Sequence, residues 1–182
     1  DALKALWVQL KMNGALAEGI GIREMPEEWF ESIDGKNDNP MITSIKVFYC
    51  NRLMEMHKFE QTKEEIKKVL ESNMVLVGVY RYLLICDYIY CELIDGNIIE
   101  AEEFYTKDLQ KFMKSMKKFP AILRTKYTYE LLHNKDSKQA EKLRTLFNIM
   151  SEKYPYTSDI EAENELMDIA KSIYDGVMDN KK

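Results

Sequence analysis

Residues 74–94 read MVLVGVYRYLLICDYIYCELI, and residues 95–116 continue as DGNIIEAEEFYTKDLQKFMKSM. The first part is strongly apolar, Asp95-Gly96 is a turn signal, and the second part has the mixture of charged and apolar residues of an amphipathic helix. We therefore expect a buried helix, a tight turn and a second, half-exposed helix. This succession decides the fold, because the same pattern recurs on both sides of it.

The recurring pattern predicts three helix pairs. They are expected at residues 41–58 and 62–72, at 74–94 and 97–116, and at 120–133 and 136–153. Thr62, with Glu65, and Asp136 are predicted to cap the second helices of the first and third pairs. The unit recurs about every 35–39 residues, which is typical of helix-pair repeats whose apolar faces are covered by neighbouring pairs. A last helix, at residues 158–178, has a polar outer face and is expected to cap the stack.

Residues 1–33 are expected to form an N-terminal helical arm, separated by a loop at residues 34–40 from a helical-repeat domain at residues 41–182. Residues 1–18 form the first predicted helix, and Pro26 begins a short second one that Trp29 and Phe30 anchor. The first helix is predicted to be amphipathic, with a single apolar stripe made of Leu3, Leu6, Trp7, Leu10, Ala15 and Leu16.

The composition is that of a soluble protein, with 46% hydrophobic and 31% charged residues. The formal net charge of −5 argues against nucleic-acid binding, which favours a basic surface. The chain begins with Asp1, so we expect a fragment of a longer protein. Residues 74–94 are long enough to span a membrane, but Arg81, Asp87 and Glu92 would each cost about 2.5–3.5 kcal/mol there. We expect no membrane span.

No catalytic or metal-binding constellation is found. Cys50, Cys86 and Cys91 lack metal-knuckle spacing and are expected to be buried free thiols in a reducing, cytoplasmic compartment. Glu130 and His133 match one half of a di-iron motif, but the sequence contains no second copy of Glu-x-x-His. Adjacent acids on a helix point about 100° apart and do not converge for acid–base chemistry. We predict no enzyme activity, no metal and no cofactor.

A basic run lies in the third quarter of the chain. Its members are Lys107, Lys111, Lys114, Lys117, Lys118 and Lys126. Such a run is either a solvated helix face or a patch for anionic lipid or an acidic partner.

Tyrosines are concentrated on the first helices of the second and third pairs, and two interpretations are open. They pack in the core, or they line a groove, where Tyr and Arg concentrate binding energy. On the second interpretation Arg81, Tyr90, Arg124 and Tyr127 are candidate contacts for a protein or peptide partner.

Residues 95–105 resemble the turn and second helix of a tetratricopeptide repeat (TPR). The resemblance implies that Gly96 allows the tight turn, Ala101 is the small residue at the helix crossing and Tyr105 fills the adjacent groove. A weaker copy surrounds Ala140. The expected fold is therefore an all-α, TPR-like α-α superhelix with an N-terminal arm and a C-terminal capping helix.

A second resemblance covers residues 6–29, from Leu6-Trp7-Val8-Gln9-Leu10 to Arg23-Glu24-Met25-Pro26-Glu27-Glu28-Trp29. This segment is similar to the one that follows the membrane core in some bacterial site-2-type zinc metalloproteases. It implies a cytosolic tail, without the protease's own zinc ligands, that recruits a substrate or regulator. The predicted function is non-catalytic protein–protein interaction. The alternatives are a peptide-sensing regulator, a structural dimerisation module that makes a homodimer, and an enzyme whose site escaped notice.

Overall fold

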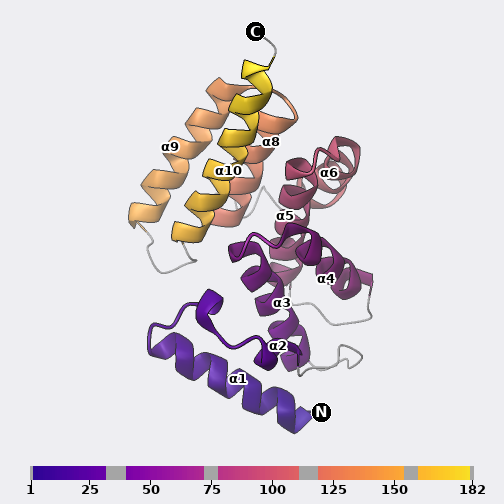
Figure 1. Cartoon of the computed structure of the whole chain (residues 1–182), viewed down its shortest axis with the longest axis vertical. Coiled ribbons are helices and arrows are strands. Elements are labelled where there is room, and N and C mark those ends of the chain that lie inside the picture. Colours follow the sequence, from indigo (N-terminus) through magenta and orange to yellow (C-terminus); the bar gives the residue numbers. More distant parts are fainter. Residues whose placement is uncertain (1, 32–39, 72–77, 111–118, 154–159, 181–182) are drawn as a thin grey trace. The chain divides into compact units, whose positions relative to one another are not determined.

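A computed structural model of the chain describes residues 2–31, 40–71, 78–110, 119–153 and 160–180 (Figure 1). The regular structure of these residues is helical, with no strand among them. The predicted all-α fold class is thereby confirmed. The chain forms two compact units, residues 1–84 and residues 85–182, and the predicted loop at 34–40 falls almost entirely outside the described residues.

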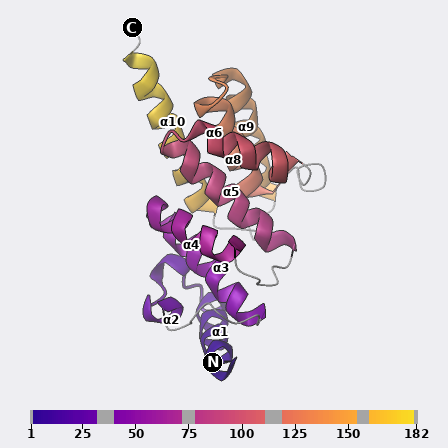
Figure 2. The same cartoon turned by 90° about the vertical axis from the view of Figure 1, so that its right-hand side faces the viewer.

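Unit 1 is built around helix α3 (Pro40–Glu55). The helix contacts α1 (Ala2–Ala17), the 3-10 turn η1 (Ile22–Glu24), α2 (Glu28–Glu31) and α4 (Phe59–Glu71). Figure 2 shows α3 and α4 side by side. Helix α5 (Gly78–Ile94) begins in this unit.

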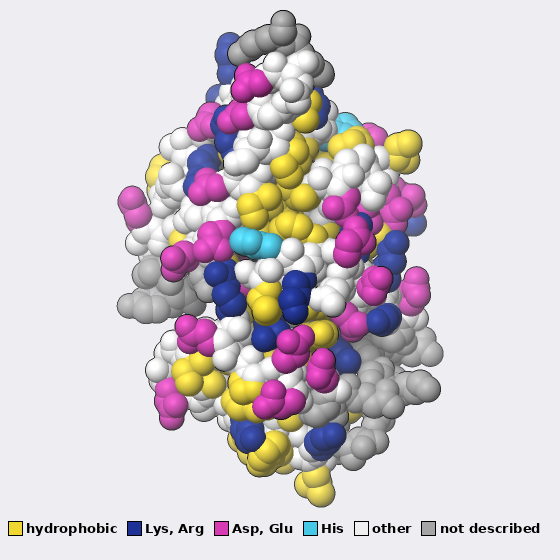
Figure 3. Space-filling view, viewed as in Figure 1, with side chains coloured by type: hydrophobic (Ala, Val, Ile, Leu, Met, Phe, Trp, Pro, Cys, Tyr) yellow, Lys and Arg dark blue, Asp and Glu magenta, His cyan; other side chains and the backbone are white. Residues whose placement is uncertain are grey.

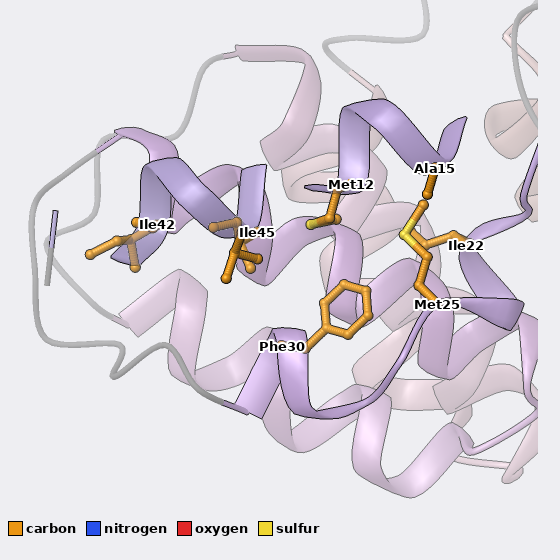
Figure 4. Packing of buried hydrophobic residues seen from close by; sticks show 9 residues of the cluster. Met12, Ala15, Ile22, Met25, Phe30, Ile42 and Ile45 are labelled. Carbon is orange, nitrogen blue, oxygen red and sulfur yellow. The ribbon is translucent and has the colours of Figure 1, made fainter. Parts of the chain in front are cut away.

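The core of unit 1 lies between α1, α2 and α3. Its buried side chains are Ala5, Val8, Met12, Ala15, Ile22, Met25, Phe30, Ile42 and Ile45, and seven of them are labelled in Figure 4. Phe30 is fully buried and its ring stacks on Tyr49 of α3, with the centroids 5.5 Å apart. The predicted anchoring by Trp29 and Phe30 is confirmed, since Trp29 also packs against this core.

Unit 2 contains the rest of α5, then α6 (Ile98–Phe104), the π-helical turn η2 (Tyr105–Leu109), α8 (Pro120–Leu132), α9 (Ser137–Lys153) and α10 (Ile160–Asp179). Helix α8 is at its centre and packs against both α9 and α10, which lie beside it in Figure 1. Nearly every residue of α8 is buried.

A residue with a left-handed backbone follows each of the helices α1, α3, α5 and α8. These residues are Gly19, His57, Gly96 and Lys135, at spacings of 38, 39 and 39. At Gly96 the N–H of Asn97 donates to Glu92 O at 2.8 Å, which closes the preceding helix in a Schellman motif. The turn expected at Gly96 is confirmed, and glycine accepts its φ of 82° without strain.

The second helices also keep a common register relative to these turns. Thr62, Ala101 and Ala140 each stand five residues after the turn residue, and all three are fully buried. Small side chains there let the two helices of a pair approach closely. Tyrosine recurs eight residues before three of the turn residues, at Tyr49, Tyr88 and Tyr127. These three tyrosines therefore follow the same 39-residue spacing as the turns at His57, Gly96 and Lys135.

The π-helical turn η2 adjusts that register in one hairpin. Val69 and Phe147 are buried twelve residues after their turns, whereas Leu109 is buried thirteen residues after Gly96. A π turn accommodates one extra residue in a helix. The extra residue brings Leu109, and not Asp108, to the buried position.

The two cap predictions have different outcomes. The carboxylate of Asp136 accepts a 3.0 Å hydrogen bond from the backbone N–H of Gln139, so the predicted N-cap of α9 is confirmed. The prediction for Thr62 is wrong: α4 begins at Phe59, and the Thr62 hydroxyl lies inside the helix and donates to Lys58 O. The start predicted for the last helix, at residue 158, lies outside the described residues.

Candidate interaction surface

Two of the four predicted contact residues, Tyr90 and Arg124, meet in the core of unit 2. The guanidinium of Arg124 lies 2.7 Å from the Asp87 carboxylate and 3.3 Å from that of Glu163. It also lies 5.1 Å from the centre of the Tyr90 ring, and the Tyr90 hydroxyl donates to Leu166 O. These contacts tie α5, α8 and α10 together.

Burial and the neighbouring charges act in opposite directions on the pKa values of this cluster. Burial raises the pKa of Asp87, although the neighbouring Arg124 acts in the opposite direction. For Arg124, burial disfavours the charged form, but Glu163 and Asp87 outweigh it and the pKa is raised. Arg124 is therefore the permanent cation that makes two acids tolerable in the interior.

The other two predicted contacts lie elsewhere. Tyr127 is buried on α8, where burial raises its pKa to about 12. Arg81 is exposed and belongs to unit 1. The exposed fractions are 0% for Tyr90, 1% for Arg124 and 2% for Tyr127, so a partner could reach these three only after rearrangement of the core.

The predicted cysteine state is confirmed, because Cys50, Cys86 and Cys91 are free and buried. Burial raises the pKa of the Cys86 thiol to about 12. Within the described part of the chain, no three His, Cys, Asp or Glu side chains are grouped so that they could hold a metal. His133 stacks on Tyr129, with the ring centres 4.4 Å apart.

The basic run is only partly described. Lys107 lies 3.7 Å from Glu103 one turn earlier, which is an exposed pair of a solvated face. Lys111, Lys114, Lys117 and Lys118 lie outside the described residues.

Helix α1 has two apolar faces, and only one of them is used in the fold. Ala5, Val8, Met12 and Ala15 point into the core of unit 1. The stripe predicted from the sequence is largely on the other side: Leu3 is 83% exposed, Leu10 60%, Trp7 56% and Leu6 42%. The predicted single packing stripe is therefore wrong, because Ala15 alone of its six residues is buried.

We call Leu3, Leu6, Trp7 and Leu10 the outer stripe of α1. Steps of three and four residues bring them onto one helix face. Figure 3 shows apolar side chains in a row along α1, at the lower end of the view, with Lys or Arg side chains next to them. Singly exposed leucines are normal, but four large apolar side chains on two successive turns form a patch.

Two lysines line one edge of the outer stripe. Lys4 and Lys11 are seven residues apart, and α1 contains no acid between Ala2 and Ala17. The ammonium group of Lys11 lies 3.4 Å from the centroid of the Trp7 ring and 5.3 Å from that of Trp29. The opposite edge is neutral, with Gln9 donating a hydrogen bond to Asn13.

The sequence contained the signal for this surface. Eleven of the 16 residues of α1 are apolar, whereas a helix with one buried face needs only one stripe. The extra stripe was visible, but its spacing does not say which of the two faces the core.

No protein family matches the sequence, and neither a curated protein nor a solved structure gives a match. No helix within the described ranges is both long enough and apolar enough to cross a bilayer.

Proposed function

We propose that this chain is a non-catalytic protein-interaction domain that binds its partner through the outer stripe of α1. The single observation that supports this most is the exposure of Leu3, Leu6, Trp7 and Leu10 on one helix face. Full burial of a large apolar side chain stabilises by about 1.5–3 kcal/mol. A partner that covers Leu3, Trp7 and Leu10 therefore gains several such contributions from one short helix.

The rigid backing of the stripe also supports the proposal. Opposite faces of one helix carry the outer stripe and the packed side chains of Val8 and Met12. The exposed residues are thus held in a fixed geometry before binding, and a partner does not have to order this part of the chain.

We further propose that the helix pairs belong to a TPR-like repeat array. Support comes from the turn residues Gly19, His57, Gly96 and Lys135, with their nearly constant spacing, and from the small buried residues Thr62, Ala101 and Ala140. Helix-pair repeats present extended binding surfaces without catalytic residues of their own.

The parent of the domain is proposed to be a site-2-type membrane zinc metalloprotease. The support is the resemblance of residues 6–29 described above. On this proposal the partner is a substrate or a regulator of the protease, and the domain lies on the cytosolic face.

The test is capture of a partner by matched surface variants. The full chain, Leu3→Ser/Leu10→Ser and Ile99→Ser are immobilised and exposed to proteins of the source cell, and retained proteins are identified and purified. Ile99 is an exposed apolar residue on α6 and is not a member of the stripe. A purified partner should bind the full chain and Ile99→Ser, but not the Leu3→Ser/Leu10→Ser variant. Equal binding by all three would reject the outer stripe as the binding surface.

A further inference from the structure

The occupant of the outer stripe can be deduced from the charges that border it; this inference rests on the proposed function. Lys4 and Lys11 lie on one edge of the stripe, one heptad apart. Among the described residues, neither lysine has a carboxylate within 4 Å. The contacts of Lys11 are with the two indole rings.

The residues of the stripe also follow heptad spacing. Leu3, Trp7, Leu10 and Gly14 succeed one another at steps of four, three and four residues. This is the spacing of a seam between two packed helices, and it assigns the two lysines to the flanking positions where interhelical ion pairs form.

The glycine at position 14 indicates that a partner helix approaches α1 closely there. Gly14 is exposed in the last turns of α1, and a Cβ added there would have nothing within 4 Å. Glycine within a helix costs about 1 kcal/mol relative to alanine. Nothing in the packing of unit 1 requires glycine at this position, because a Cβ would fit there. A partner helix that crosses α1 closely at Gly14 would occupy the open space.

We propose that the outer stripe binds an amphipathic helix whose flanking positions are acidic, with carboxylates that pair with Lys4 and Lys11. A second copy of α1 fits less well. In an antiparallel pair the same flanking positions of the two helices face each other, which places lysines against lysines. In a parallel pair Lys11 would meet Leu6 of the other copy, and α1 has no acid to offer.

A membrane surface is also a poorer occupant. An interfacial helix has a polar face rich in lysine and arginine, whereas the face of α1 opposite the outer stripe is packed into the protein core. Gly14 adds no apolar area for a bilayer, and only one edge of the stripe is basic.

The inference is tested with two synthetic peptides of three heptads each. Both have leucine at the seam positions; one has glutamate and the other lysine at the flanking positions. We measure their affinities for the full chain and for Lys4→Glu/Lys11→Glu, with Leu3→Ser/Leu10→Ser as the apolar control. The substituted side chains lie outside the core, and circular dichroism verifies that each variant is folded.

The full chain should bind the acidic peptide about three- to tenfold more tightly than the basic one, as expected for two exposed ion pairs. Lys4→Glu/Lys11→Glu should reverse this preference, and Leu3→Ser/Leu10→Ser should bind neither peptide. Gly14→Ala should weaken acidic-peptide binding, whereas Gly176→Ala, an equally open glycine in α10, should not.

Four results would overturn the inference. They are equal affinities of the full chain for the two peptides, binding of neither, an unaffected Gly14→Ala variant, and another occupant that depends on Leu3 and Leu10. The last would appear as a concentration-dependent dimer in sedimentation, or as binding to phosphatidylserine-containing vesicles in preference to the peptide. In these cases the proposed function is judged separately, by capture of the purified partner. If the purified partner binds the Leu3→Ser/Leu10→Ser variant as well as it binds the full chain, the proposed function itself fails.

Discussion

Arg124 of α8 and Asp87 of α5 form a buried ion pair in which Nη2 and Oδ1 lie 2.7 Å apart. Glu163 of α10 completes the cluster. The two charged partners come from helices that are distant in sequence, so the pair helps to specify how the helices of unit 2 pack. Removing one member of such a pair leaves a buried charge without compensation.

Arg124→Met is expected to destabilise the chain by about 3–5 kcal/mol, because Asp87 and Glu163 lose their shared cation. Arg144→Met is the matched control, since Arg144 pairs with the largely exposed Asp168. Its loss should stay below about 1 kcal/mol. Denaturant unfolding of both variants measures the difference. Equal losses would show that the Arg124 cluster is no more important than a surface pair.

Stability should fall at alkaline pH. The pKa of Cys86 is raised by burial from 9.0 to about 12 in the folded chain. Between these values the unfolded chain releases a proton that the folded chain keeps, so this contribution is complete below about pH 9 and is lost as the pH rises towards 12. Tyr127, whose pKa burial raises from 10.0 to about 12, acts in the same sense.

Each such group lowers the free energy of unfolding by up to about 1.4 kcal/mol per pH unit within its window. Denaturant unfolding at about pH 8 and about pH 11 measures the fall. Cys86→Ala should make the fall shallower, whatever its effect on stability at the lower pH. An identical pH dependence in the variant would contradict a buried, titration-resistant thiol.

Deletion of Thr106 should be tolerated. Thr106 is exposed within η2, and its removal would convert the π turn to a regular helix with Leu109 still at the buried position. Deletion of Glu141, an exposed residue of regular helix α9, should be far more damaging, because it rotates Phe147 out of the core. Thermal unfolding of the two deletions tests this. Similar losses would contradict the role of η2 as a one-residue insertion.

Gly14→Ala should stabilise the folded chain by about 1 kcal/mol, since the added methyl group has open space around it and removes the helix penalty of glycine. Gly19→Ala is the opposing control, because Gly19 has a φ of 81° that alanine rarely adopts. It should destabilise. Chemical denaturation decides the sign for each. A destabilising Gly14→Ala would mean that α1 packs differently from the structure described.

Local sequence signals predicted much of the fold. The turn at Gly96 and the cap at Asp136 depend on residue types that favour one local geometry, and both were correctly predicted. Thr62 failed for a related reason: threonine accepts both a cap and a helix-interior position, where its hydroxyl donates to a backbone oxygen of the preceding turn. The left-handed turn at His57 could not be predicted, because histidine gives no comparable signal.

The outer stripe of α1 was harder to predict than the helices. Periodicity shows that α1 has apolar residues on two sides, but only tertiary contacts decide that Val8 and Met12 face the core and Leu3 and Leu10 do not. Arg124 illustrates the converse. Its charge favoured a surface position, and the paired acids that allow its burial come from α5 and α10, distant in sequence.

The central claim is that the outer stripe of α1 is the surface that a partner covers. Its most direct test is site-specific cross-linking, with a photoreactive amino acid placed either at Leu6, within the stripe, or at Ile99, a site on α6 that is more exposed than Leu6. The account predicts that the purified partner cross-links efficiently at Leu6 and only at background level at Ile99. Cross-linking at Ile99 with none at Leu6 would contradict it.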